Sequence, residues 1–73
     1  MDGDVVTSPS VGRVIEILVG VGESVRSGQE VAVIESMKVE IPVAAPVAGR
    51  VARIAVATGD QIQAGDTLLT IAR

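Results

Sequence analysis

Short runs of β-branched and other apolar residues recur along the chain, and glycines or polar residues separate them. Such runs are typical of β-strands, because branched side chains pack well on a pleated surface. Nowhere does the apolar spacing keep the period of a helix over a useful length. The pattern predicts about eight short strands, at Val5–Thr7, Val14–Val19, around Val25, Val31–Glu35, Val39–Val43, Val51–Val56, around Ile62 and Leu68–Ile71.

The first of the longer runs alternates imperfectly between apolar and polar positions. Ile15, Ile17 and Val19 fall on one face of the predicted strand, whereas Val14 falls on the other. An apolar residue stands at the corresponding place in the second half of the chain, at Val51. We therefore expect either burial on both faces of the strand or a β-bulge at this place.

The chain consists of two copies of one unit, related by a shift of 37 positions. Residues 9–36 lie over residues 46–73 without a gap, and both copies keep the same spacing between their glycines. Nine gapless identities are hard to reach by chance, so the repeat is taken as real. The identical pairs are Pro9/Pro46, Gly12/Gly49, Arg13/Arg50, Val14/Val51, Ile17/Ile54, Val19/Val56, Gly22/Gly59, Gly28/Gly65 and Ile34/Ile71.

Few architectures bury so many short strands in 73 residues. The pattern favours an all-β fold, either two small sheets packed face to face or a flattened barrel. We expect a single domain over residues 1–73, because a chain of this length supports only one small core. The apolar stripes are interpreted as an aliphatic core of valine and isoleucine rather than as a ligand pocket.

The composition excludes several classes of function. The chain has no Cys, no His and no aromatic residue, which removes disulfides, the usual metal-ligand clusters and His-based catalysis. With net charge −3, it offers neither a basic patch nor stacking platforms for nucleic acid. No apolar run is long enough to span a membrane, and the acidic first residues do not resemble a signal peptide. These features predict a cytoplasmic module with no catalytic or metal-binding residues of its own.

Lys38 is the only lysine of the chain, and it lies between the two copies of the repeat. Strand-like runs flank the dipeptide Met37-Lys38, which predicts a two-residue hairpin turn at 37–38. Ser36 would then face Val39, and Glu35 would face Glu40. The shift of 37 carries residue 38 onto the chain ends, so a two-fold axis would place Lys38 and the termini at opposite poles.

This turn conflicts with local rules. Tight hairpins favour Asn-Gly, Asp-Gly or Gly-X, and Met-Lys is none of these. Like charges at Glu35 and Glu40 across a strand pair are mildly unfavourable. Places where local sequence rules fail are candidate functional sites. We expect Glu35 to be a solvated charge and leave two possibilities for Met37, packing against the barrel or contact with a partner enzyme.

The segment Glu35-Ser36-Met37-Lys38 resembles the attachment motif of the biotinyl/lipoyl attachment family, and the resemblance covers nearly the whole chain. In this family two four-stranded antiparallel sheets with quasi-two-fold symmetry form a flattened barrel, the barrel-sandwich hybrid, with the modified lysine on an exposed hairpin. In length the chain is most similar to small free-standing biotin carriers. The matching framework reads Ser8-Pro9-x-x-Gly12-x-Val14, Gly22-Glu23-x-Val25-x-x-Gly28, Ala45-Pro46-x-x-Gly49-x-Val51 and Gly59-Asp60-x-Ile62-x-x-Gly65-Asp66.

The resemblance implies that Lys38 carries covalent biotin. Lipoyl carriers usually have Asp before the lysine, so Met37 favours biotin, while Val39 stands where biotin carriers usually have a second Met. Glu35, Ser36 and Val39 complete the flanking motif. The implied partners are a biotin protein ligase, a biotin carboxylase and a carboxyltransferase, between which a monomeric carrier would move a carboxyl group on biotin.

Two alternatives remain from the sequence. A lipoyl carrier of a 2-oxoacid dehydrogenase complex shares the fold and the lysine. An unmodified adaptor domain shares the fold alone, although the known adaptors carry a long helical insertion where this chain has nine residues. An enzyme in its own right has no support, because no nucleophile–base pair is present.

Overall fold

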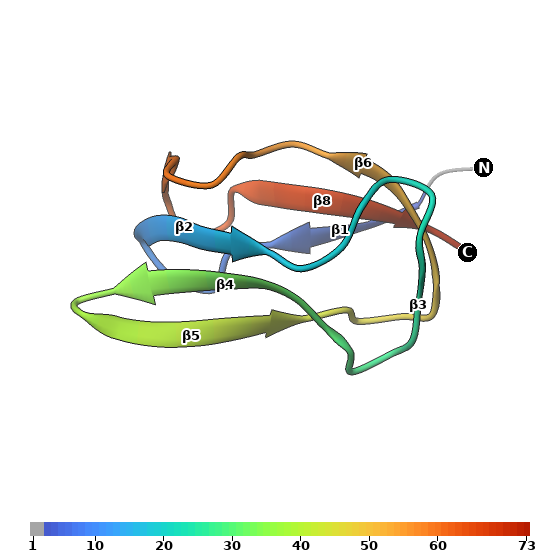
Figure 1. The fold of residues 1–73 in the computed structure, drawn as a ribbon, viewed down its shortest axis with the longest axis horizontal. Helices are drawn as coiled ribbons and strands as arrows, with labels where there is room; N and C mark the ends of the chain where they lie inside the picture. The colour runs from blue at the N-terminus through green and yellow to red at the C-terminus, as the bar shows by residue number, and fades with distance from the viewer. Residues whose placement is uncertain (1–2) are drawn as a thin grey trace.

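The computed structural model describes residues 3–73 of the chain, and every regular element in that range is a β-strand. The strands form two four-stranded sheets of order β1-β8-β6-β3 and β5-β4-β2-β7, and every neighbouring pair is antiparallel (Figure 1). The predicted all-β fold is therefore confirmed. The elements are β1 (Asp4–Thr7), β2 (Gly12–Ile17), β3 (Ser24–Val25), β4 (Glu30–Ser36), β5 (Val39–Ala44), β6 (Gly49–Ile54), β7 (Gln61–Ile62) and β8 (Thr67–Ala72).

The two sheets are equivalent under the 37-residue repeat. The shift carries β5, β4, β2 and β7 onto β1, β8, β6 and β3, in the same order within the sheet. The turns follow the same rule. The Gly22 amide donates to the Val51 carbonyl at 2.7 Å, and the Gly59 amide donates to the Val14 carbonyl at the same distance. Across residues 3–73, each backbone hydrogen bond between turns and loops has such a counterpart.

The β-bulge that the sequence allows is present in both copies. The pairing of β2 with β4 shifts between Val14 and Glu16, and the pairing of β6 with β8 shifts between Val51 and Arg53. Val14 and Val51 are each only 1% exposed, so the bulge turns both side chains into the core.

The predicted bounds of these strands are wrong by two residues. The sequence predicts strands at 14–19 and 51–56, whereas the structure has Gly12–Ile17 and Gly49–Ile54. Gly12 joins the ladder because it pairs with Ile62 of β7, a contact that depends on tertiary structure. At the other end Val19 lies beyond the last paired residue of β2 but is still buried. A prediction from apolar residues alone therefore placed the strand end too far along the chain.

The core is aliphatic, as predicted, and lies between the sheets. Its largest fully buried members come from both halves of the repeat, three from the first and four from the second. The short strands β3 and β7 each add one buried residue, Val25 and Ile62. The fully buried side chains are Ile34, Leu68, Leu69, Ile71, Val14, Val31 and Val51.

The domain is elongated, with extents of 35 × 18 × 16 Å. The tip of the β4–β5 hairpin lies at one end of the long axis, and the C-terminus lies at the other with the start of β1 (Figure 1). At that second end Arg73 pairs with Asp4 at 2.5 Å. The predicted opposition of Lys38 and the chain ends holds for the C-terminus, and Met1 falls outside the described residues.

Residues 3–73 contain no helix long and apolar enough to cross a membrane. The same residues contain no group of three or more acidic side chains placed to hold a metal ion. The expected cytoplasmic location stays a prediction.

Candidate functional site at the β4–β5 hairpin tip

Met37 and Lys38 form the whole connection between β4 and β5. Ser36 pairs with Val39 and Glu35 pairs with Glu40, the register predicted from the sequence. Both turn residues have positive φ, 52° at Met37 and 66° at Lys38. Two consecutive left-handed residues are what a tight hairpin of this kind requires, and Asn or Gly normally supplies them.

The turn is strained because neither of its residues is glycine. Among residues 3–73, Met37 and Lys38 are the only non-glycine residues with positive φ. For a residue with a Cβ this left-handed conformation costs about 1–2 kcal/mol of free energy. Such strain persists where the surrounding structure over-determines the backbone, and it concentrates at functional sites.

The side chains of the tip are open to solvent. Met37 is 93% exposed and Val39 is 59% exposed, and Lys38 is exposed as well. Met37 therefore does not pack against the barrel, which removes one of the two interpretations of this residue. An exposed Met and Val beside an amine give the tip an apolar rim that a partner protein can cover.

Ser36, by contrast, is nearly buried, with 9% of its surface exposed. Its Oγ lies 3.0 Å from the Oγ of Ser10, which belongs to the connection between β1 and β2. Ser8, in the same connection, is 2% exposed and donates from its Oγ to the Ser10 carbonyl at 2.6 Å. The last residue before the turn is thus tied to the connection between β1 and β2, 26 positions earlier in the chain.

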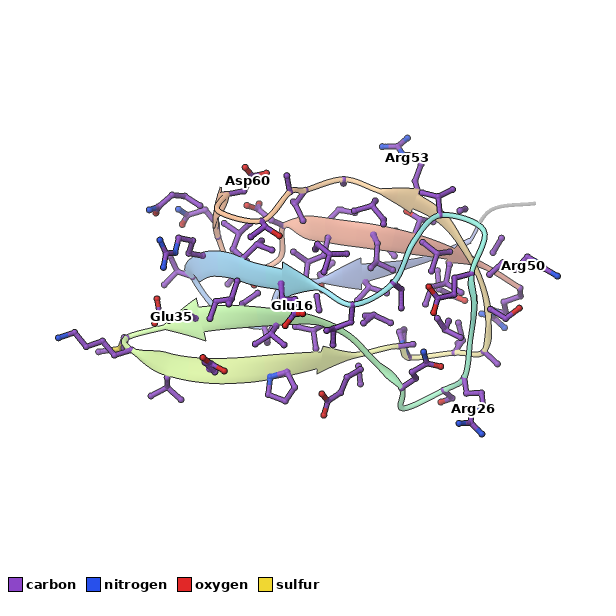
Figure 2. The ribbon with its side chains drawn as sticks, in the orientation of Figure 1. Glu16, Arg26, Glu35, Arg50, Arg53 and Asp60 are labelled. Carbon is purple, nitrogen blue, oxygen red and sulfur yellow. The ribbon has the colours of Figure 1, made fainter. Side chains whose placement is uncertain are left out.

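Glu35 is half-buried and pairs with Arg13 of β2 at 3.4 Å. Its side chain keeps 36% of its surface exposed to solvent, and the antiparallel register places Arg13 directly opposite it. Figure 2 shows Glu35 at the end of the molecule that carries the hairpin tip. Arg13 also offsets the repulsion that the sequence predicts between Glu35 and Glu40.

Gly12 lets the β2 backbone pass close to β4 just before the tip. A Cβ on Gly12 would lie 2.2 Å from the Glu35 carbonyl oxygen, far inside van der Waals contact. The repeat places the same close approach at Gly49, where a Cβ would lie 2.3 Å from the Ala72 carbonyl oxygen. These two identities of the repeat are thus explained by backbone packing.

Sequence reasoning missed the two serines of the β1–β2 connection. The signal that could have found them is a break in the repeat, since Ser8, Ser10 and Ser36 correspond to Ala45, Val47 and Arg73. The contacts of Ser8 with Ser10 and of Ser10 with Ser36 therefore have no counterpart in the second copy.

The end of the molecule opposite the tip carries a shallow hollow. Its volume is about 460 Å³, and Figure 2 shows Arg50, one of its lining residues, at that end. Arg50 donates to the Gly22 carbonyl at 3.0 Å. Arg73, which also lines the hollow, pairs with Asp4, and this contact holds the pKa of Asp4 below its usual value of 3.8. None of these groups lies near the hairpin tip.

The arrangement offers one reactive group, an exposed primary amine at one end of an elongated domain. Lys38 does not line the hollow at the opposite end, and among the described residues its amine has no hydrogen bond or ion pair. An exposed amine of this kind can be acylated by another protein, and the long aliphatic stem of lysine can carry a group beyond the surface of the domain.

A family model described as "Biotin-requiring enzyme", the biotin/lipoyl domain family, matches residues 4–71. The chain belongs to this family. It is similar over 43 residues, at 46% identity, to the biotin-dependent acyl-coenzyme A carboxylase alpha3 subunit of Mycobacterium leprae. This match covers 59% of the chain and 7% of that subunit.

A small protein is among the relatives too. The chain is 47% identical over 34 residues to the biotin/lipoyl attachment protein of Bacillus subtilis, a match that covers 47% of each. Among solved structures, the urea carboxylase of Kluyveromyces lactis superposes with a TM-score of 0.92 at 35% identity. That superposition covers 99% of the chain and 6% of the carboxylase, so the chain spans only part of the relatives it matches.

Proposed function

We propose that Lys38 is the attachment site of biotin and that the chain acts as a carrier within a biotin-dependent carboxylase. One observation carries the proposal: the single lysine of the chain stands, exposed to solvent, in a strained turn at one end of the domain. The family to which the chain belongs, described as biotin-requiring, supports the choice of cofactor. So does the name of the M. leprae relative, a biotin-dependent carboxylase subunit. The K. lactis neighbour, also named a carboxylase, supports the class of enzyme.

The attachment step needs an activated acyl group from a biotin protein ligase. Only the neutral amine of Lys38 is nucleophilic, so the ligase must first accept a proton from the ammonium. The amine nitrogen then attacks the carbonyl carbon of biotinyl-adenylate. A C–N bond forms, the bond from the carbonyl carbon to the phosphate oxygen breaks, and AMP leaves with the electron pair. A second proton leaves the nitrogen, and Lys38 becomes a neutral amide.

Lys38 would hold biotin, which would supply a carrier for a carboxyl group between a biotin carboxylase site and a carboxyltransferase site. The residues of the chain itself present and position this arm. The rigid two-sheet body keeps the tip at the end of a 35 Å axis, away from the C-terminus. A tethered arm raises the effective concentration of the carried group at each site. A monomeric carrier suits this role best, because its tip has to enter two different sites.

Biotin is favoured over lipoate by the residue next to the lysine. Met37 is uncharged and 93% exposed, so it presents an apolar contact to any enzyme that approaches Lys38. Lipoyl carriers usually have Asp at this position. The lipoyl carrier stays the second candidate, since the B. subtilis relative is named for both groups.

The proposal is tested by intact-mass measurement after incubation with biotin protein ligase, ATP and biotin, beside a lipoate-ligase reaction. We expect one biotinyl increment on the wild type, none on Lys38→Arg, and none with lipoate. Lys38→Arg keeps the charge and the fold, so it is the matched control. A lipoyl increment alone would transfer the proposal to oxoacid dehydrogenase chemistry, and no increment in either reaction would support the unmodified adaptor.

A further inference from the structure

The polar contacts behind the hairpin tip exist in only one of the two copies of the repeat. The backbone framework is shared, since each turn and loop hydrogen bond has a partner 37 residues away. Ser10 and Ser36 depart from this symmetry, because Val47 and Arg73 stand in the equivalent places. The contact between the two hydroxyls is therefore specific to the end of the domain that carries Lys38.

These contacts link the turn to the core in three steps. The backbone of Ser8 is fixed at both groups: its amide donates to Asp66, and its carbonyl accepts from Gly65, each at 2.9 Å. The Oγ of Ser8 then donates to the Ser10 carbonyl at 2.6 Å. The Oγ of Ser10 finally reaches the Oγ of Ser36 at 3.0 Å.

The other side of the turn has no comparable support. Val39, the first residue of β5, is 59% exposed, and Glu40 is exposed too. Neither side chain makes a hydrogen bond or ion pair to another described residue. The conformation of Met37 and Lys38, strained at both positions, therefore depends on its attachment through β4.

We infer that Ser10 is a positioning residue for the acylation of Lys38. By holding Ser36, it keeps the strained turn in the single conformation that a ligase recognises. The inference rests on the proposed function for its enzymatic readout. An unanchored tip would spend part of its time in other conformations, and a binding partner would then see a lower effective concentration of the competent form.

Loss of one neutral hydrogen bond changes a local equilibrium by about 2- to 10-fold. In Ser10→Ala we expect the amides of Met37 to Val39 to exchange with solvent faster by about that factor. The KM for the protein in the ligase reaction should rise, by up to about tenfold, with kcat unchanged. The reason is that the fraction of competent tips falls while the chemical step is untouched.

The matched control is Ser27→Ala. The Ser27 Oγ also joins two loops, since it donates to the Pro46 carbonyl at 3.4 Å, but it belongs to the β3–β4 connection at the other end of the domain. This control should leave KM and the tip amides unchanged. Ser10→Thr, which keeps a hydroxyl, should restore both readouts. In the double variant Ser10→Ala with Ser36→Ala, KM should be no higher than in the worse single variant, because both remove the same contact.

Two kinds of failure can be told apart. If the wild type is not acylated, the proposed function fails, while amide exchange still tests the anchoring of the tip. If the wild type is acylated and Ser10→Ala shows the wild-type KM, the inference is overturned, whatever the exchange rates are. An equal rise of KM in Ser27→Ala would overturn it as well.

Discussion

The two ends of this domain are built from equivalent strands but differ in their side-chain contacts. At each end a long central strand, β4 or β8, finishes beside its neighbour β2 or β6, and a glycine allows the close approach. At one end the chain turns through Met37 and Lys38 into the next strand. At the other end the equivalent strands, β8 and β1, are paired without a connecting turn, and Arg73 binds Asp4.

The difference lies in a few side chains on a shared framework. Ser36 and Glu35 at the tip correspond to Arg73 and Ala72 at the opposite end. The former pair binds Ser10 and Arg13, and so ties the turn to its surroundings. The repeat thus supplies the scaffold, whereas the positions that break the repeat give the two ends different side-chain contacts.

The largest effect should come from the shared core. Ile34→Ala and Ile71→Ala occupy equivalent sites, both with 0% exposure, so each should cost about 2–5 kcal/mol of stability. Urea denaturation measures both. Equal losses support the equivalence of the two halves, whereas a loss confined to one variant would show that the halves are not energetically equivalent.

Substitution of the two close-packed glycines should cost less stability than the core variants and should affect the two ends differently. Gly12→Ala and Gly49→Ala each push a Cβ to within 2.2 or 2.3 Å of a carbonyl oxygen, so the backbone must shift at a cost of about 1–3 kcal/mol. Both should lower the melting temperature alike. Only Gly12→Ala, which displaces Glu35 beside the tip, should also slow the acylation of Lys38. Equal rates in the two variants would count against the role of the tip backbone.

A substitution in the strained turn should raise the stability of the domain rather than lower it. Met37→Gly removes the Cβ from a residue with φ of 52°, and it should therefore stabilise the domain by about 1 kcal/mol. For a domain of this size that corresponds to roughly 4–8 °C in melting temperature. A scanning calorimeter measures this directly. A lower melting temperature would contradict the presence of strain at the tip.

The smallest effect belongs to the end opposite the tip. Arg73 lowers the pKa of Asp4, so the pair stabilises the fold above the unfolded-state pKa and loses this contribution as pH falls through the folded-state value. Asp4→Asn should therefore lower stability slightly at neutral pH and leave it equal to the wild type in strong acid. Melting curves at several pH values test this, and an acid-only difference would refute it. Acylation of Lys38 should not change.

The sequence was enough for the features that depend on pattern and repeat. It predicted the all-β fold, the aliphatic core and the pairing of Ser36 with Val39, because apolar period and internal symmetry determine them. The predicted strand ends near Gly12 and Val19 were wrong, because a strand extends only as far as a neighbouring strand pairs with it. That pairing depends on the tertiary structure. The Ser10–Ser36 contact joins residues 26 positions apart, and only the folded geometry brings them together.

Locating the modification on the chain tests the central claim most directly. Ligase-treated wild type, Lys38→Arg and the double variant Lys38→Arg with Arg50→Lys would be digested and mapped by tandem mass spectrometry. The double variant moves the lone lysine to the opposite end of the same scaffold. We expect biotin on Lys38 of the wild type and on neither variant. Biotin on the lysine at position 50, or on any residue of Lys38→Arg, would contradict the assignment of the site to the hairpin tip.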